Sequence, residues 1–124
     1  MELKLISNSI YRGRSIDCYE VAGGLTLEKC ASYISDLVKS GLTFKSGVIS
    51  SLSDKDNWKT FSGNANYSDY HSFMTMLQSK TLESEERVSA ELFGTQNRVD
   101  IQIGFDIDFG NITFYTPVNK NIDA

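Results

Sequence analysis

The sequence predicts an α+β domain, in which an antiparallel, mostly C-terminal β-sheet of about five strands carries two α-helices on one face. Two stretches place apolar residues at helical spacing, and the C-terminal third alternates apolar and polar residues over long runs. A chain of 124 residues suits one hydrophobic core. We therefore expect residues 1–124 to form a single domain.

The N-terminal segment is predicted to form a β-hairpin. Apolar and polar residues alternate over residues 2–5 and again over 16–19, as they do in half-buried strands. Between these runs, Gly13 favours a turn. Arg12 and Arg14 flank that glycine, and we expect both at a solvated hairpin tip.

The first helix is predicted within residues 25–42. Thr26 is the expected N-cap, and Gly41 is the expected C-terminal stop. The apolar stripe that should face the sheet consists of Leu27, Cys30, Ala31, Ile34, Leu37 and Val38. This stripe places Cys30 in the core.

Residues 67–80 are predicted to form the second helix. A short strand is expected around residues 42–49, followed by a polar, turn-rich loop from Ser51 to Asn66. A calcium-binding loop beginning at Asp54 is rejected, because Lys59 stands where the sixth position requires glycine. The apolar face of the second helix should carry Tyr67, Tyr70, Phe73, Met74 and Leu77.

Two large apolar residues, Trp58 and Phe61, lie within the predicted polar loop. They either fold back against the core or anchor a partner, because Trp is enriched among the residues that contribute most to protein interfaces. The sequence leaves both interpretations open.

The C-terminal third is predicted to form a three-stranded meander. Gly110 and Asn111 lie between two alternating runs and indicate a two-residue hairpin turn, which would pair Phe109 with Ile112. The apolar face of the meander, expected against the helices, then carries Val99, Ile101, Ile103, Phe105, Ile107, Phe109, Ile112 and Phe114.

A second turn is expected at residues 94–97, as a four-residue GTQN loop that would pair Glu91 with Asp100. Two carboxylates directly opposite each other cost a few tenths of a kcal/mol unless water or a cation screens them. The polar face should therefore be open to solvent or to a partner. Its expected members are Arg87, Ser89, Glu91, Phe93, Arg98, Asp100, Gln102, Asp106, Asp108, Thr113 and Tyr115.

Carboxylates on this face raise the question of metal or hydrolytic chemistry. Asp106 and Asp108 would lie about 6.8 Å apart along the predicted strand, close enough for both to contact one cation. A third hard ligand is not expected beside them. Glycoside hydrolysis by paired carboxylates would require a sugar cleft, which a domain of this size rarely supplies.

Nucleophilic catalysis is also disfavoured by the pattern. The only histidine, His71, follows Asp69 by two residues, so the two side chains would point in different directions around a helix. Cys18 and Cys30 lack the spacing of a zinc or redox motif, and we interpret both as buried, reduced thiols. No catalytic residue, metal or cofactor is therefore expected.

The charge balance favours a protein partner. A net charge of −4 argues against a nucleic-acid partner, whose phosphates require a basic surface. The N-terminus lacks a signal-peptide pattern, and no run approaches the roughly 18 apolar residues of a membrane span. We therefore expect a cytoplasmic protein that does not bind membranes.

Our functional hypothesis is recognition without catalysis. A small acidic domain with an exposed carboxylate surface suits an inhibitor of a basic protein, such as an immunity-type protein that neutralises a toxin nuclease. The alternative is a small hydrolase or metal-dependent enzyme that uses the carboxylates of the C-terminal sheet. The predicted partner-binding residues are Glu91, Phe93, Asp100, Asp106, Asp108, Tyr115 and Trp58.

Overall fold

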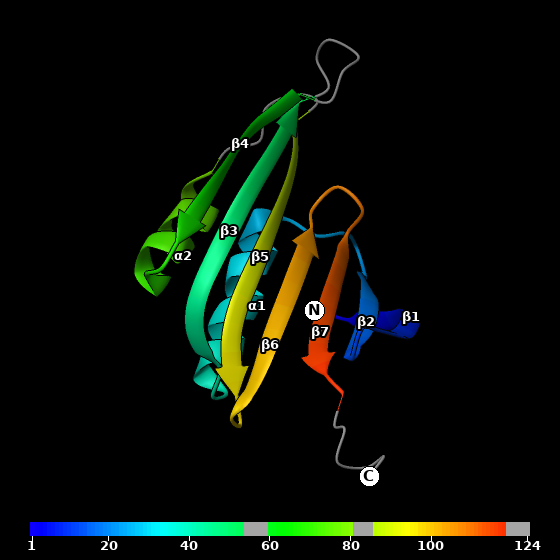
Figure 1. Cartoon of the computed structure of the whole chain (residues 1–124). Coiled ribbons are helices and arrows are strands. Elements are labelled where there is room, and N and C mark those ends of the chain that lie inside the picture. The colour runs from blue at the N-terminus through cyan, green and yellow to red at the C-terminus, as the bar shows by residue number, and fades with distance from the viewer. Residues whose placement is uncertain (54–59, 81–85, 119–124) are drawn as a thin grey trace.

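The computed structural model describes residues 1–53, 60–80 and 86–118, which form one seven-stranded antiparallel sheet with two helices (Figure 1). This arrangement confirms the α+β class. The elements, in chain order, are β1 (Leu3–Tyr11), β2 (Arg14–Val21), α1 (Leu27–Lys39), β3 (Thr43–Ser53), β4 (Thr60–Tyr67), α2 (Tyr70–Ser79), β5 (Glu86–Gln96), β6 (Val99–Asp106) and β7 (Asn111–Pro117).

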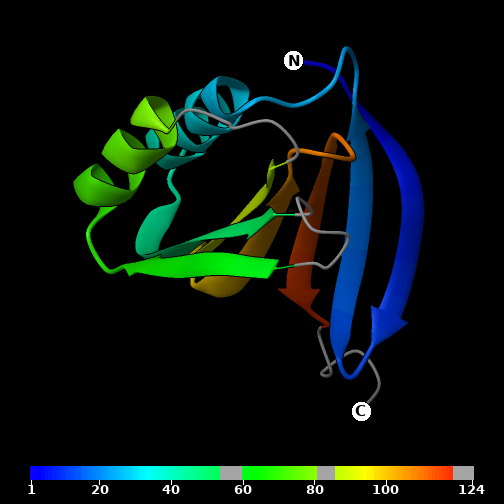
Figure 2. The same ribbon diagram turned by 90° about the horizontal axis from the view of Figure 1, so that it is seen from above.

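The strands follow the order β1-β2-β7-β6-β5-β3-β4, so the N-terminal hairpin joins the C-terminal strand. Register pairs run from Arg14 opposite Pro117 to Glu20 opposite Asn111. Both helices lie on the same side of the sheet, which twists so that β1 and β2 run at a steep angle to β3 and β4 (Figure 2). The other face carries no helix among the described residues.

The predicted capping of α1 is confirmed. Thr26 is the N-cap, and its Oγ1 accepts a hydrogen bond from the backbone N–H of Lys29 at 3.0 Å. After the helix, Gly41 adopts a φ of +115°, and the N–H of Leu42 returns to the carbonyl of Leu37. A glycine tolerates this positive φ because it has no β-carbon.

Helix α2 begins later than predicted. Its N-cap is Asp69, whose carboxylate accepts hydrogen bonds from the backbone N–H and the hydroxyl of Ser72. Tyr67 is therefore the last residue of β4 and not part of the helix. Its ring still packs near Phe73, with 6.0 Å between the ring centroids.

The core fills the space between the helices and the sheet. Tyr33 of α1 places its ring 6.4 Å from the ring centroids of both Phe105 and Phe114. The buried apolar residues are Val21, Leu25, Leu27, Cys30, Ala31, Ile34, Leu42, Ile49, Phe73, Met74, Leu77, Val88, Ala90, Leu92, Ile103, Phe105 and Ile112. No helix in the described parts of the chain has the length and apolar character needed to cross a membrane.

The prediction of a loop from Ser51 to Asn66 is wrong for all of its described residues, 51–53 and 60–66, which lie in strands. The strand β3 extends to Ser53, and Thr60–Tyr67 forms β4 at the edge of the sheet, antiparallel to β3. An edge strand pairs through its backbone on one side only, so it does not need the apolar alternation by which strands are recognised. Trp58 lies outside the described residues.

The register of the meander also differs from the prediction. The turn between β6 and β7 spans residues 107–110, so Phe105 and not Phe109 lies opposite Ile112. The N–H of Phe109 donates to Oδ1 of Asp106, and Gly110 has a φ of +69°. These features are typical of a turn that begins at an aspartate and ends at a glycine.

The turn between β5 and β6 is shorter than predicted. It consists of Asn97 and Arg98, both with positive φ, and it places Gln96 opposite Val99. Glu91 therefore lies opposite Gly104, and the predicted Glu91–Asp100 pair does not form. Because both registers shift by an even number of residues, the strand residues keep the faces assigned to them.

Candidate functional site

We call the helix-free surface of the sheet the open face. The register places Glu91, Phe93, Asp100, Asp106 and Tyr115 of the predicted site on it, and Asp108 lies in the adjoining turn. The open face also includes Ser46, Val48 and Ser50 of β3, Arg87 and Ser89 of β5, Gln102 and Gly104 of β6, Asn111 and Thr113 of β7, and Arg14, Ile16, Cys18 and Glu20 of β2.

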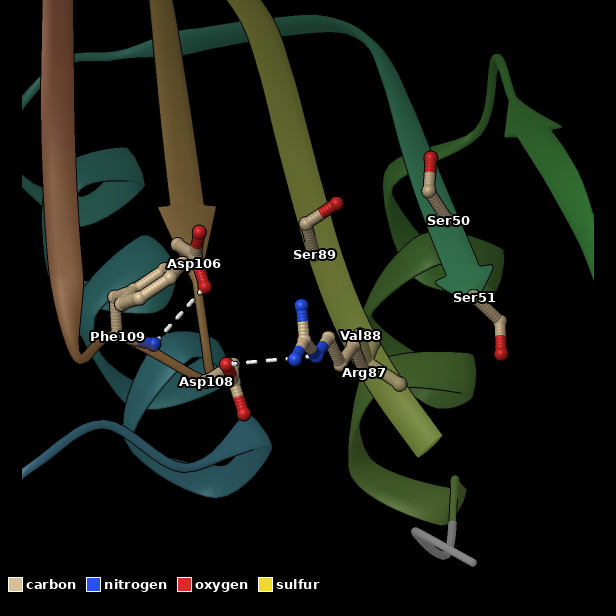
Figure 3. A pocket seen from close by; sticks show the side chains of 8 residues that line it. All are labelled: Ser50, Ser51, Arg87, Val88, Ser89, Asp106, Asp108 and Phe109. Atoms are coloured by element: carbon tan, nitrogen blue, oxygen red, sulfur yellow. Dashed lines mark hydrogen bonds and ion pairs between the residues drawn. The ribbon is translucent and has the colours of Figure 1, made fainter. Parts of the chain in front are cut away.

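A pocket of about 320 Å³ opens where β5 meets the β6–β7 turn, and we call it the turn pocket. Its lining residues are Ser50, Ser51, Arg87, Val88, Ser89, Asp106, Asp108 and Phe109. Figure 3 shows the side chains of Arg87 and Asp108 pointing toward each other, with Nε and Oδ2 3.8 Å apart. Both side chains are partly exposed, so this ion pair contributes at most about 1 kcal/mol.

Two carboxylates and an aromatic ring lie together at this pocket. Asp106 is held by its own turn, because its Oδ1 accepts the N–H of Phe109 at 3.1 Å. The turn also presents the Phe109 side chain to solvent, with 69% of its surface exposed. The prediction that Phe109 packs in the core is therefore wrong. Ile107, by contrast, is partly buried against the core.

The turn pocket suits the side chain of a lysine or arginine. The methylene stem of such a residue can pack on the exposed ring of Phe109, and its cation can approach Asp106 and share Asp108 with Arg87. Charge-assisted hydrogen bonds to carboxylates are among the stronger polar contacts. The residue types and the volume of the pocket therefore match a basic side chain.

A second pocket, of about 310 Å³, lies at the opposite end of the open face. Arg14 lines this pocket, and its guanidinium lies 4.8 Å from the ring centroid of Tyr115 and donates from Nη1 to Oε1 of Gln102 at 2.8 Å. Gln102 in turn donates from Nε2 to Oε2 of Glu91 at 3.1 Å. Phe93 also lines the pocket and is half-buried.

One carboxylate at this end has a basic partner that the sequence did not predict. Nζ of Lys45 lies 3.2 Å from Oδ1 of Asp100. Lys45 reaches this position because a bulge interrupts β3 between Phe44 and Ser46. A bulge has no simple sequence pattern, whereas Asp106 followed by Gly110 was a readable turn signal that the alternating pattern obscured.

The cysteines and the histidine lie in separate parts of the molecule. Cys30 is fully buried on α1, as predicted, and burial raises the pKa of its thiol to about 12. Cys18 was predicted to be buried, but it is half-buried on the open face, where it pairs with Thr113 of β7. His71 is exposed on α2, on the helix side of the sheet. Within residues 1–53, 60–80 and 86–118, no three His, Cys, Asp or Glu side chains gather where they could hold a metal ion.

The chain matches no protein-family model, and no similar curated protein or solved structure was found.

Proposed function

We propose that this protein is a non-catalytic inhibitor of a basic protein and that it binds its partner through the open face. The observation that carries the proposal is the turn pocket, where Asp106, Asp108 and the exposed ring of Phe109 surround a space that fits a basic side chain. Buried aromatic anchors and charge-assisted contacts are the usual sources of affinity at protein interfaces.

Electrostatics supports a basic partner more generally. The chain carries a net charge of −4, and such a field accelerates encounter with a positively charged surface. A nuclease has a basic substrate site, because it must neutralise phosphates. In the finer form of the proposal, the protein is an immunity-type inhibitor, and its carboxylates occupy the positions that phosphates take in a toxin nuclease.

We do not advance the alternative of a hydrolase or metal-dependent enzyme. His71, the only histidine in the chain, lies on the helix side of the sheet, away from the carboxylates of the open face. A hydrolytic site would need an acid, a base or a metal within hydrogen-bond reach of the same substrate atom. No observation on the open face favours that arrangement.

The test measures binding kinetics with a basic partner captured by the wild-type chain. The carboxylates attract a basic partner before contact, and salt screens that attraction over roughly 8 Å at physiological ionic strength. Replacing Asp106 and Asp108 by lysine should therefore slow association and make the association rate less dependent on salt. Phe109→Ala should instead raise the dissociation rate, because a desolvated ring holds the complex together after encounter.

A matched control makes the same charge change on the helix side. Glu28 and Asp36 are both exposed on α1. Their replacement by lysine changes the net charge by the same amount, but it should slow association less than the change at Asp106 and Asp108. Equal slowing by both double variants would show that only net charge matters. A partner that stays fully active when bound would contradict inhibition.

A further inference from the structure

The second pocket of the open face, which we call the Arg14 pocket, differs from the turn pocket in charge. Its charged lining residues are Arg14, Lys45 and Asp100, whereas those of the turn pocket are Arg87, Asp106 and Asp108. The lining of the Arg14 pocket therefore has an excess of positive charge, and the lining of the turn pocket has an excess of negative charge. One open face thus offers sites of opposite sign at its two ends.

The guanidinium of Arg14 retains most of its hydrogen-bonding capacity. Its one hydrogen-bond partner among the described residues is Oε1 of Gln102, a neutral acceptor. A guanidinium carries five N–H donors, so most of them are left for a ligand or for water. No carboxylate among the described residues forms an ion pair with Arg14, because Asp100 is paired with Lys45.

Neighbouring side chains hold this guanidinium in place. Gln102 donates from Nε2 to Glu91, and this bond turns its amide oxygen toward Arg14. The ring of Tyr115 lies at a distance from the guanidinium that is typical of a cation–π contact. The planar donor group is therefore oriented before a ligand arrives, so binding costs less side-chain freedom.

We propose that the Arg14 pocket binds a carboxylate carried by an apolar stem or ring. Arginine matches the two oxygens of a carboxylate with two parallel N–H donors. Phe93 and Ile101 line the same space and are half-buried, so they supply apolar surface for the rest of the ligand. A singly charged group fits better than a phosphate, because Asp100 also lines the pocket and repels a dianion more strongly.

The test titrates the isotope-labelled chain with benzoate and follows the backbone amide signals by NMR. Benzoate should bind with a dissociation constant of about 1 mM, and the signals of Phe93, Gln102 and Tyr115 should shift most. Benzamide has nearly the same shape without the charge, and it should bind about tenfold more weakly. The titration needs no partner protein, so its failure is distinct from failure of the proposed function.

Variants test the role of Arg14. Arg14→Met removes the charge but keeps an unbranched side chain, and it should raise the dissociation constant of benzoate about tenfold or more. Arg14→Lys should restore only part of the affinity, because an ammonium group lacks the planar pair of donors. The control is Arg12→Met, because Arg12 lies over the ring of Tyr11 and does not line the pocket. It should change the constant by about twofold or less.

The carboxylate can belong to a free small molecule or to an acidic side chain of the protein bound by the open face, and the second case rests on the proposed function. A titration with glutamate blocked at its amino and α-carboxyl groups separates the two sources. Tighter binding of benzoate assigns the pocket to a free aromatic carboxylate, and tighter binding of the blocked glutamate assigns it to an acidic side chain.

Three results would overturn the proposal. The first is the absence of saturable binding of either carboxylate to the wild-type chain below about 20 mM. The second is binding of benzamide as tight as that of benzoate. The third is a larger loss of affinity in Arg12→Met than in Arg14→Met, with the amide spectrum of each variant verifying that it is folded.

Discussion

The two cysteines show how strongly the environment of a single residue depends on the face it occupies. Cys30 lies on the apolar stripe of α1 and has no exposed surface. Cys18 lies on the open face of β2 and is half-buried. A thiolate is the reactive form of cysteine, and burial in apolar surroundings disfavours it. The two thiols should therefore differ sharply in reactivity.

We predict that a thiol-specific reagent at mildly alkaline pH labels Cys18 in the native protein and leaves Cys30 unmodified. In denaturant, both residues should react, because the burial that raises the pKa of Cys30 is lost on unfolding. Cys18→Ser and Cys30→Ser variants assign the labelled residue. Rapid labelling of Cys30 in the folded chain would show that α1 is not packed as described.

The Cys30 thiol should make the free energy of unfolding fall at alkaline pH. The folded-state pKa of Cys30, about 12, lies above the ordinary value of 9.0, so the folded chain retains a proton that the unfolded chain loses. The stabilisation is complete below pH 9 and is lost as pH rises toward 12. When the pH is raised from below 9 to 10, the free energy of unfolding of the wild-type protein should fall by about 1 kcal/mol more than that of Cys30→Ala.

At the scale of elements, the turns determine which residues face each other on the open face. Asn97 and Arg98 have φ values of 52° and 66°, the left-handed conformation that two-residue hairpins require at both positions. Asparagine tolerates this conformation, but arginine is rarely found there. The turn that places Phe93 opposite Gln102 is therefore strained at Arg98.

We predict that Arg98→Gly raises the free energy of unfolding by about 1 kcal/mol, because glycine removes the steric cost of the left-handed conformation. Denaturant titration measures the change. Asn97→Gly is the control and should have a smaller effect. Destabilisation by Arg98→Gly would instead support the four-residue loop predicted from the sequence, in which Arg98 belongs to the strand.

At the scale of the whole molecule, the sheet has one packed face and one open face. The space available for a side chain at a glycine depends on the face on which that glycine lies. Gly47 lies on β3 under α2, where a β-carbon would be 2.5 Å from Cε1 of the buried Phe73. Gly104 lies on the open face of β6, where a β-carbon would meet only Cε1 of Tyr115, at 3.8 Å. The first distance is a clash, and the second is an ordinary contact.

Gly47→Ala should therefore lower the free energy of unfolding by about 1–3 kcal/mol, the usual cost of overpacking a core. Gly104→Ala should change it by about 0.5 kcal/mol or less, as surface substitutions usually do. Both are measured by denaturant titration with circular dichroism. If the two variants lost equal stability, the open face would have to be covered in the free protein.

The face on which the candidate residues lie was predicted more fully than their neighbours across the sheet. Alternation placed Glu91, Phe93 and Asp106 on one face correctly, because the side-chain period of a strand is two and survives an even shift of register. The pairing of Glu91 with Asp100 was wrong, because it depended on turn lengths. Lys45 and the exposed ring of Phe109 were missed, since a bulge and a turn conformation position them.

The sequence by itself determined the two helices, their apolar stripes, the N-cap at Thr26 and the two faces of the C-terminal strands. Each of these depends on residues within a few positions of one another, so local spacing and local hydrogen bonds suffice. Only the tertiary structure decided that β2 pairs with β7, that β4 is a strand, and that Lys45 meets Asp100. These contacts join residues far apart in the chain, and their free energy comes from burial and backbone pairing that no local pattern encodes.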